Sequence, residues 1–449
     1  MKKDFGKLAF LCLLASCVVL ILPAQSQAQE PFSWIWTWNG LPPFPVWDHD
    51  CYGYNMAFDS QQNLYVVDSG NCRIIKFDKD GRFVLAWGSY GTENGQFIFG
   101  QWTGGGIAID RDDNVWITEG GPGGSYYRVQ KFNNQGGFLA EYVDPNWADY
   151  PYAFSIPSGI DIDHDGYFYI VARMPNAQIK KFDPDFSYVN GFGNNSIDDS
   201  DPYNFWYSTD VAVNSKGDIY VAVWGEGAIG SPYPSRIKKF NSSYVFQKEW
   251  SLDSVTSLAI DADDNLYACS VRGPEMGVYI YNSDGDLIQR IAPNAATPEE
   301  NGNGLIWSPI GVGVDTMGNV FITDLVGRIQ KFAPPFITVS VDIQPVSFPN
   351  SVNPKSNGKI PVAILTTDAF DAGVVAPATV TFGKTGSEAA ASHYALEDVN
   401  GDGRLDMVLH FGTQETGIAC GDTKAFLKGK TQSGRALKGE DSIKTVGCK

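Results

Sequence analysis

One short segment near the C-terminus has the residue types and spacing of a site for a hard cation. Its oxygen-bearing positions are Asp398, Asn400, Asp402, the backbone carbonyl of Arg404, and Asp406. Oxygens at positions 1, 3, 5, 7 and 9 of a loop can converge on Ca²⁺, and Gly403 at position 6 permits the sharp turn. The alternative is a plain Asp/Asn/Gly turn, since Leu409 replaces the acidic residue that ends an EF-hand loop. We expect calcium at this loop.

Elsewhere the sequence holds few residues in the patterns of known catalytic centres. It has neither a G-x-S-x-G nucleophile elbow nor a phosphate-binding P-loop. The segment Asp161–Gly166 begins like a second calcium loop, but it occupies a turn that recurs between neighbouring strands, so a hairpin turn explains it. We leave open whether the protein is an enzyme and favour the interpretation that it is not.

The composition excludes some classes of partner. Lys and Arg number 33 against 51 Asp and Glu, a net charge of -18, which repels phosphate backbones. Nucleic acid is therefore not an expected partner. With 43% hydrophobic and 19% charged residues the chain can form a core. Its 13% aromatic residues, 48 Gly and 25 Pro favour many short strands and turns.

The first 28 residues have the layout of a secretory signal peptide. Three lysines precede the apolar run 8–22, and small residues precede a predicted cleavage after Ala28. The apolar run is short for a membrane span, and no other stretch is long enough for one. An alternative is lipoprotein cleavage before Cys17. We expect a secreted, periplasmic or cell-surface protein without a transmembrane segment.

Similar segments recur along the middle of the chain. Their aromatic strand anchors are Tyr65, Trp116, Tyr169, Tyr220, Tyr267 and Phe321, spaced by 51, 53, 51, 47 and 54 residues. Each anchor follows a turn such as DRDDN and precedes an echo of RIIKFD. Each unit therefore predicts four antiparallel strands, and a repeat of this length predicts a six-bladed β-propeller.

The repeats also predict how the ring closes and where it ends. The sixth repeat lacks a fourth strand, and the segment Phe32–Gly40 aligns with the fourth strand of the first repeat. We expect this segment to be the outer strand of the last blade, which removes the open edge. The domains predicted are a signal peptide at 1–28, a propeller at 29–337 and a small β-domain at 338–449 that holds the calcium loop.

The first repeat, D-S-G-N-x-R-I-x-K-F-D from Asp68 followed by WGSYG, resembles the NHL repeat family. The resemblance covers residues 32–337 and is weakest in the fifth repeat, where Ile280 and Tyr281 replace the Lys-Phe pair. It implies an all-β propeller that acts as a platform for a ligand or a protein. A minority of such propellers resemble lyases or lactonases.

The enzymatic alternative depends on the centre of the ring. The three-histidine zinc centre of amidating lyases is excluded there, because His393 and His410 lie outside the repeats and His164 lies in a turn. Lactonase-type propellers hold calcium at the channel mouth, and Asn55 and Asp210, from opposite blades, could supply part of such a site. Both residues could instead cap backbone amides.

A binding surface is the favoured function. Loops of the second-to-third strand connections and the aromatics near them would project from one face. The candidate contact residues are Trp102, Tyr126, Tyr127, Trp224 and Tyr233. They could stack on sugars or peptide aromatics, or pack between blades. We expect an exported recognition or scaffold protein that binds a protein, peptide or carbohydrate, with structural calcium. The alternative is a calcium-dependent lactonase or lyase.

The cysteines of an exported protein can form disulfides. Cys51 precedes the first strand of the first blade and Cys72 follows the second, so the two could pair. Cys420 and Cys448 are the two cysteines of the second domain and could form a second disulfide. We expect Cys269 to be a buried thiol. The second domain resembles an accessory domain of secreted microbial proteins. Its calcium loop is similar to the short loops of integrin-like or dockerin-like modules.

Overall fold

The computed structural model describes most of the chain after the predicted signal peptide. The ranges are 32–38, 55–99, 105–120, 127–143, 156–173, 177–196, 198, 200–224, 235–272, 276–291, 302–334, 336–345, 347–367 and 370–448. Within them the regular elements are strands and short 3-10 helices, which confirms the all-β class. No helix in these ranges could cross a membrane.

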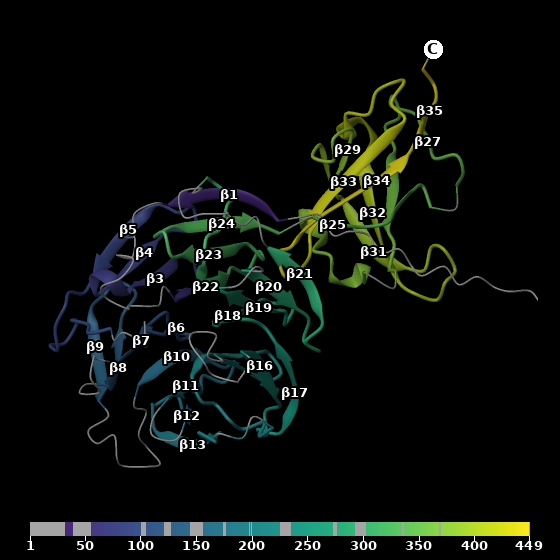
Figure 1. Cartoon of the computed structure of the whole chain (residues 1–449). Coiled ribbons are helices and arrows are strands. Elements are labelled where there is room, and N and C mark those ends of the chain that lie inside the picture. Colours follow the sequence, from purple (N-terminus) through teal and green to yellow (C-terminus); the bar gives the residue numbers. More distant parts are fainter. Residues whose placement is uncertain are drawn as a thin grey trace, which may run out of the picture.

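Four-stranded antiparallel sheets are arranged as the blades of a ring, as Figure 1 shows. Six of the four-stranded sheets in the described residues belong to the ring. Five have consecutive strands: β2 (Met56–Phe58), β3 (Leu64–Asp68), β4 (Arg73–Phe77) and β5 (Phe83–Trp87); β6 (Ile107–Ile109), β7 (Val115–Gly120), β8 (Tyr127–Phe132) and β9 (Phe138–Val143); β10 (Pro157–Ile162), β11 (Phe168–Ala172), β12 (Gln178–Phe182) and β13 (Tyr188–Phe192); β14 (Ser208–Val213), β15 (Ile219–Val223), β16 (Arg236–Phe240) and β17 (Phe246–Ser251); β18 (Val255–Ile260), β19 (Leu266–Ser270), β20 (Gly277–Tyr281) and β21 (Leu287–Ile291).

The sixth sheet joins the two ends of the propeller sequence. It comprises β22 (Pro309–Val314), β23 (Val320–Asp324), β24 (Ile329–Ala333) and the N-terminal strand β1 (Ser33–Trp38). Strand β1 pairs antiparallel with β24, and Trp38 faces Ile329. This pairing is the predicted closure, and it covers the edge that β24 would otherwise expose.

The propeller core consists of clusters between neighbouring blades. In one of them, Trp116 of the second blade stacks against Phe186 of the third at 5.3 Å and lies 4.5 Å from Phe168. Alternate residues of each strand face the two neighbouring blades, so both faces of a blade are apolar. Burial of these rings, at about 25 cal/mol per Å² of apolar surface, holds adjacent blades together.

A polar contact inside the first blade shows how three of the recurring sequence features fit together. In the first blade, Tyr65 donates a hydrogen bond to Asp59 at 3.0 Å, and the Lys76 ammonium lies 3.3 Å from the same oxygen. Lys76 faces Tyr65 across strands β3 and β4. The turn aspartate, the aromatic anchor and the lysine of the third strand thus form one network that fixes the first turn.

The arginine that opens the third strand has a second structural role. Arg128 on β8 is fully buried and pairs with Glu119 at the end of β7. Its guanidinium also donates to the backbone carbonyls of Thr92 and Gln96, at 2.9 and 2.7 Å. Arg328 makes the equivalent contacts in the last blade. These arginines tie a blade to the segment that enters it.

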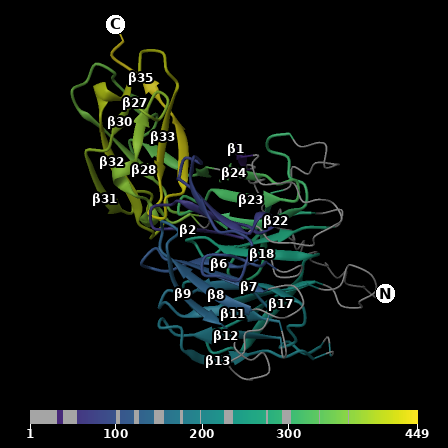
Figure 2. The same ribbon diagram turned by 90° about the vertical axis from the view of Figure 1, so that its left-hand side faces the viewer.

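A second β unit follows the ring and stands beside it in Figures 1 and 2. One sheet has the order β25-β34-β33-β29-β30, another β26-β28-β32-β31, and β27 pairs with β35. The strands are β25 (Ile337–Thr338), β26 (Val341–Ile343), β27 (Ser351–Val352), β28 (Lys359–Ile364), β29 (Thr381–Gly383), β30 (Ala389–Ala390), β31 (His393–Glu397), β32 (Asp406–Gly412), β33 (Lys424–Lys430), β34 (Ala436–Ser442) and β35 (Lys444–Thr445). Side chains from both larger sheets form its separate core.

Candidate functional site

The inner strands of the ring enclose a central cavity of about 410 Å³. Asn55 and Asp210, predicted as possible channel residues, both line it. So does Asp161, which the sequence analysis assigned to a hairpin turn. Asp163, two residues later, is the true turn residue, because its carboxylate accepts hydrogen bonds from the backbone of Asp165 and Tyr167. The lining thus includes the Asn55 amide and the carboxylates of Asp161 and Asp210, together with Asp261 and Asp264 of the fifth repeat.

The two channel carboxylates connect neighbouring blades. One Asp161 oxygen accepts a hydrogen bond from the Val213 backbone N–H at 2.7 Å, and one Asp210 oxygen accepts from Leu258 at 2.8 Å. The second oxygen of each carboxylate accepts from the next residue of its own strand. Asn55 donates to the Gly105 carbonyl at 3.2 Å. Asp210 thus caps backbone N–H groups, whereas Asn55 binds a backbone carbonyl instead.

Burial in the channel changes the protonation of both aspartates. It raises the pKa of Asp161 and that of Asp210 to about 7 each, despite the backbone hydrogen bonds that favour the charged form. The charge of Asp161 also raises the pKa of Asp210. Near neutral pH the channel therefore holds carboxyl groups that are partly protonated, and they can donate as well as accept protons.

A signal for Asp161 was present in the repeat alignment. The position two before the turn residue is Ala57, Ala108, Ala212, Ala259 or Gly313 in the other repeats. Alternate residues of a strand share a face, so this position lies on the same face as the position four before the turn. The small residues leave space in the channel, and the third repeat places a carboxylate there instead.

Aromatic rings and guanidinium groups gather at one end of blades three to five; Trp206, Tyr207 and Arg272 are exposed there, whereas Trp224 and Arg173 are half-buried. Trp206 and Tyr207, just before β14, are 44% and 41% exposed, and their rings lie 5.8 Å apart. The Tyr207 carbonyl accepts from the backbone of Trp224, just after β15. The guanidinium of Arg173 lies 5.7 Å from the Tyr207 ring, and that of Arg272 lies 5.7 Å from the Trp224 ring. We call these five residues the aromatic patch.

The aromatic patch overlaps the predicted contact residues only in part. Trp224 belongs to it, whereas Tyr127 is 7% exposed and contributes to the interior instead. Tyr127 is the first residue of β8 and pairs with Gly120 of β7, which is also buried. Trp102, Tyr126 and Tyr233 lie outside the described residues. Trp206 and Tyr207 were missed because they precede an inner strand rather than follow a second strand.

The predicted calcium loop connects β31 to β32. The Asp398 carboxylate accepts from the backbone of Gly401 at 2.8 Å and of Gly403 at 3.0 Å. Asn400 and Asp402 accept from the backbone two residues ahead, and both are exposed. The loop is therefore closed around its own oxygen-bearing side chains, as in an Asx turn. A left-handed φ of +86° at Gly403 makes its close turn possible.

Asp406 differs from the other predicted ligands. It is fully buried, and its two oxygens accept from the backbone of Thr366 at 2.8 Å and of Val399 at 3.1 Å. It holds the end of the loop to the neighbouring strand. The described residues contain no group of three or more His, Cys, Asp or Glu side chains placed to hold a metal. The exposed oxygens of the loop nevertheless suit a hard cation in chemical type.

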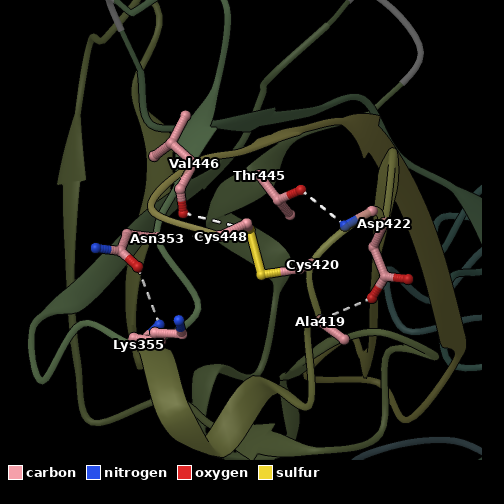
Figure 3. The surroundings of a disulfide bond; sticks show 9 residues. Asn353, Lys355, Ala419, Cys420, Asp422, Thr445, Val446 and Cys448 are labelled. Atoms are coloured by element: carbon pink, nitrogen blue, oxygen red, sulfur yellow. Dashed lines mark hydrogen bonds between the residues drawn. A yellow bond between two sulfur atoms is a disulfide. The ribbon is translucent and has the colours of Figure 1, made fainter.

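One of the two predicted disulfides is present. Cys420 and Cys448 are joined, with their Cα atoms 5.7 Å apart, and the bond ties the C-terminal segment to the loop before β33 (Figure 3). Cys51 lies outside the described residues, so its predicted pairing with Cys72 stays a prediction. Cys269 is fully buried in β19, and burial raises the pKa of its thiol, in agreement with an inert core residue.

Four-stranded sheets around a central cavity, followed by a second β unit, define a β-propeller protein with an appended domain. No protein-family model matches the chain. Solved structures with a similar fold include a streptogramin B lyase, 14% identical over 62% of this chain and 78% of that chain, with a TM-score of 0.40. Another is a gluconolactonase-like protein, 11% identical over 64% and 90%, with a TM-score of 0.43.

Curated sequences give the narrower assignment. NHL repeat-containing protein 3 of Mus musculus is 27% identical over 176 residues, which are 37% of this chain and 48% of the mouse protein. Protein brain tumor of Drosophila melanogaster is 25% identical over 139 residues, 31% of this chain and 12% of the fly protein. The chain thus matches less than half the length of these relatives. Together with the observed sheets, the matches show that the chain carries an NHL-type β-propeller.

Proposed function

We propose that this protein is an exported recognition or scaffold protein that binds a protein, peptide or carbohydrate through the propeller face bearing the aromatic patch. The observation that carries the proposal is the exposure of Trp206 and Tyr207 beside two guanidinium groups. Trp, Tyr and Arg are the residues that contribute most to binding energy in known interfaces. Rigid rings also stack on sugars at a low cost in side-chain entropy.

The position of the patch supports a role in binding rather than in folding. Large aromatic side chains that only stabilise the ring are buried between blades, as Trp116 and Phe205 are. Trp206 follows the buried Phe205 directly but is 44% exposed. The net charge of -18 disfavours polyanions and leaves polar or neutral ligands as the expected partners.

The test is a screen of wild-type protein against glycan and peptide arrays, repeated with Trp206→Ala/Tyr207→Ala. A ligand that the wild type binds and the double variant does not bind supports the patch. Tyr394→Ala is the matched control, because Tyr394 is 55% exposed but lies in the second β unit. Equal loss in the control, or unchanged binding by the double variant, would reject this face as the site.

The same proposal includes structural calcium in the second β unit. Asp398, Asn400, Asp402 and the Arg404 carbonyl would hold the ion, and Asp406 would position the loop from its buried hydrogen bonds. Calcium titration calorimetry of Asp402→Ala is the direct test. Asp165→Ala in the turn of the third blade is the control, since it alters an Asp-rich turn that we assign no ion.

Export through a signal peptide is also part of the proposal. The disulfide Cys420–Cys448 is compatible with an oxidising compartment. Mass spectrometry of the mature N-terminus after bacterial expression tests it: a start at residue 29 agrees with cleavage after Ala28. A lipidated Cys17 would establish surface anchoring instead, and a retained N-terminus would contradict export.

The alternative function is a calcium-dependent lactonase or lyase with its site in the channel. The observation in its favour is the pair Asp161 and Asp210, whose pKa values are raised to about 7 beside a cavity of about 410 Å³. Against it, both carboxylates already accept backbone hydrogen bonds. The test is lactone hydrolysis by the wild type with added calcium. Activity that is lost in Asp161→Asn/Asp210→Asn would show that the protein is an enzyme rather than a recognition protein.

A further inference from the structure

The fifth repeat departs from the others at one position of the turn network. In the other repeats a lysine of the third strand faces the aromatic anchor of the second strand. In the fifth repeat, Ile280 faces Tyr267. Tyr267 still donates to the turn residue Asp261 at 3.0 Å, but this repeat supplies no cation of its own at that place.

The loss of the lysine leaves an acidic turn without internal compensation. Burial raises the pKa of Asp261, and the charge of Asp263 raises it further. In the first blade burial also acts on Asp59, but hydrogen bonds from Asn63 and Tyr65 and the charge of Lys76 lower its pKa overall. The turn of the fifth repeat therefore lacks a lysine of its own beside Asp261, and the Lys216 ammonium of the fourth blade lies 3.9 Å from Asp264 in the same turn.

The second β unit presents such a charge. An Arg435 Nη1 atom lies 3.1 Å from an Asp263 oxygen, with the two side chains 35% and 38% exposed. Burial and Asp261 raise the pKa of Tyr267, whereas Arg435 lowers it, so the guanidinium acts on the network of this turn. Arg435 lies in the connection between β33 and β34 of the second unit.

Two further contacts surround this ion pair. A Cβ built on Gly434 would meet the Thr316 carbonyl at 3.0 Å, so the hairpin backbone packs closely on the turn of the sixth blade. The Lys430 ammonium lies 3.9 Å from the Met317 sulfur in the same turn. A half-exposed ion pair is weak by itself, and close backbone packing beside it is what gives the contact a fixed position.

We infer that the β33–β34 hairpin docks the second β unit on the propeller at the turns of blades five and six, with Arg435 in the role of the lysine that the fifth repeat lacks. The two units then form one body rather than two modules on a tether. The first-to-second strand turns and the aromatic patch lie at opposite ends of the inner strands, because β14 begins beside the patch and ends at its turn. Docking therefore leaves the patch free.

Small-angle X-ray scattering of the full chain tests the docking. We expect a compact, single-shape particle for the wild type and a larger maximum dimension for Arg435→Glu and Gly434→Val, with circular dichroism unchanged. Asp263→Arg added to Arg435→Glu should restore the wild-type dimension, because it reverses the ion pair. Asp112→Arg is the control, since Asp112 holds the same turn position in the second repeat and is exposed.

A wild-type particle that already has a broad range of dimensions would overturn the inference, as would Arg435→Glu with wild-type scattering. The replacement of the lysine has its own test. In a double-mutant cycle, Arg435→Glu should lower the melting temperature less when Ile280→Lys is present, because the new lysine compensates Asp261 from within the repeat. Strictly additive shifts would show that Arg435 does not take the lysine's role.

Discussion

Asp210 accepts a hydrogen bond from the Leu258 backbone N–H at 2.8 Å, so a carboxylate of the fourth blade holds the inner strand of the fifth. Asp161 holds the strand of the fourth blade in the same way, through Val213. The channel polar groups are thus part of the ring's construction. Asp161 and Asp210 therefore have a structural role, the linking of neighbouring inner strands, whether or not they also take part in chemistry.

The raised pKa of Asp210 predicts a pH dependence of stability. Its pKa is about 7 in the folded protein and near the usual 3.8 in the unfolded chain, so the folded state binds the proton more tightly. The free energy of unfolding should fall as pH rises from about 4 to about 7, by at most ~1.4 kcal/mol per pH unit, and level off above that. Asp210→Asn should reduce this slope.

Urea unfolding of wild type and Asp210→Asn at several pH values measures the difference. Other carboxylates contribute to each profile, and subtracting the two profiles isolates Asp210. A difference that does not change between pH 4 and pH 7 would show that Asp210 is charged throughout this range in the folded protein.

The lysine of the turn network should contribute to stability in proportion to its burial. Lys76→Met removes a cation whose side chain is 6% exposed beside an Asp59 side chain that is 2% exposed, and should cost about 3 kcal/mol. Lys131→Met in the second blade should cost about 1 kcal/mol, because that side chain is 23% exposed. Chemical unfolding gives both values, and equal costs would contradict the network as described.

Deletion of residues 29–40 should cause aggregation, because it removes β1 and exposes the edge of β24. Light scattering at increasing protein concentration measures the effect. Trp38→Ala is the control: it removes the ring contact with Phe77 at 4.8 Å but keeps the strand pairing, so it should destabilise the protein without causing aggregation. A soluble, monomeric deletion variant would show that closure does not depend on β1.

The disulfide should stabilise the second β unit. Its cysteines are 28 residues apart in sequence, and a loop of this length corresponds to about 3.5 kcal/mol of lost entropy in the unfolded chain. Cys420→Ser/Cys448→Ser should lower the unfolding free energy of this unit by 2–4 kcal/mol. Differential scanning calorimetry measures the change. A thermal unfolding midpoint that does not change when the disulfide is reduced would show that the disulfide does not stabilise this unit.

The fold could be predicted from sequence because its signals repeat. The turn aspartate, aromatic anchor and lysine recur at a spacing near 51 residues, and the structure joins them in one contact, as with Asp59, Tyr65 and Lys76. The closing strand could also be found, because it fills a gap in the last repeat. Local patterns of this kind carry the information for blades and their closure.

The candidate site was less predictable because its residues break the repeat. Asp161 lies in a D-x-D-x-D-G pattern that suggests a turn, and only the alignment of neighbouring alanines reveals its place in the channel. Trp206 and Tyr207 are candidates because their side chains are exposed. Exposure depends on how neighbouring blades pack, which the sequence pattern does not show. The contact of Arg435 with Asp263 joins residues 172 positions apart that share no pattern.

Binding by the aromatic patch is the central claim, and calorimetry with a ligand from the array screen tests it most directly. Three proteins are compared: wild type, Trp206→Ala/Tyr207→Ala, and the channel variant Asp161→Asn/Asp210→Asn. The account predicts at least a tenfold loss of affinity in the patch variant, about 1.4 kcal/mol or more, and wild-type affinity in the channel variant. Affinity kept by the patch variant and lost in the channel variant would contradict it.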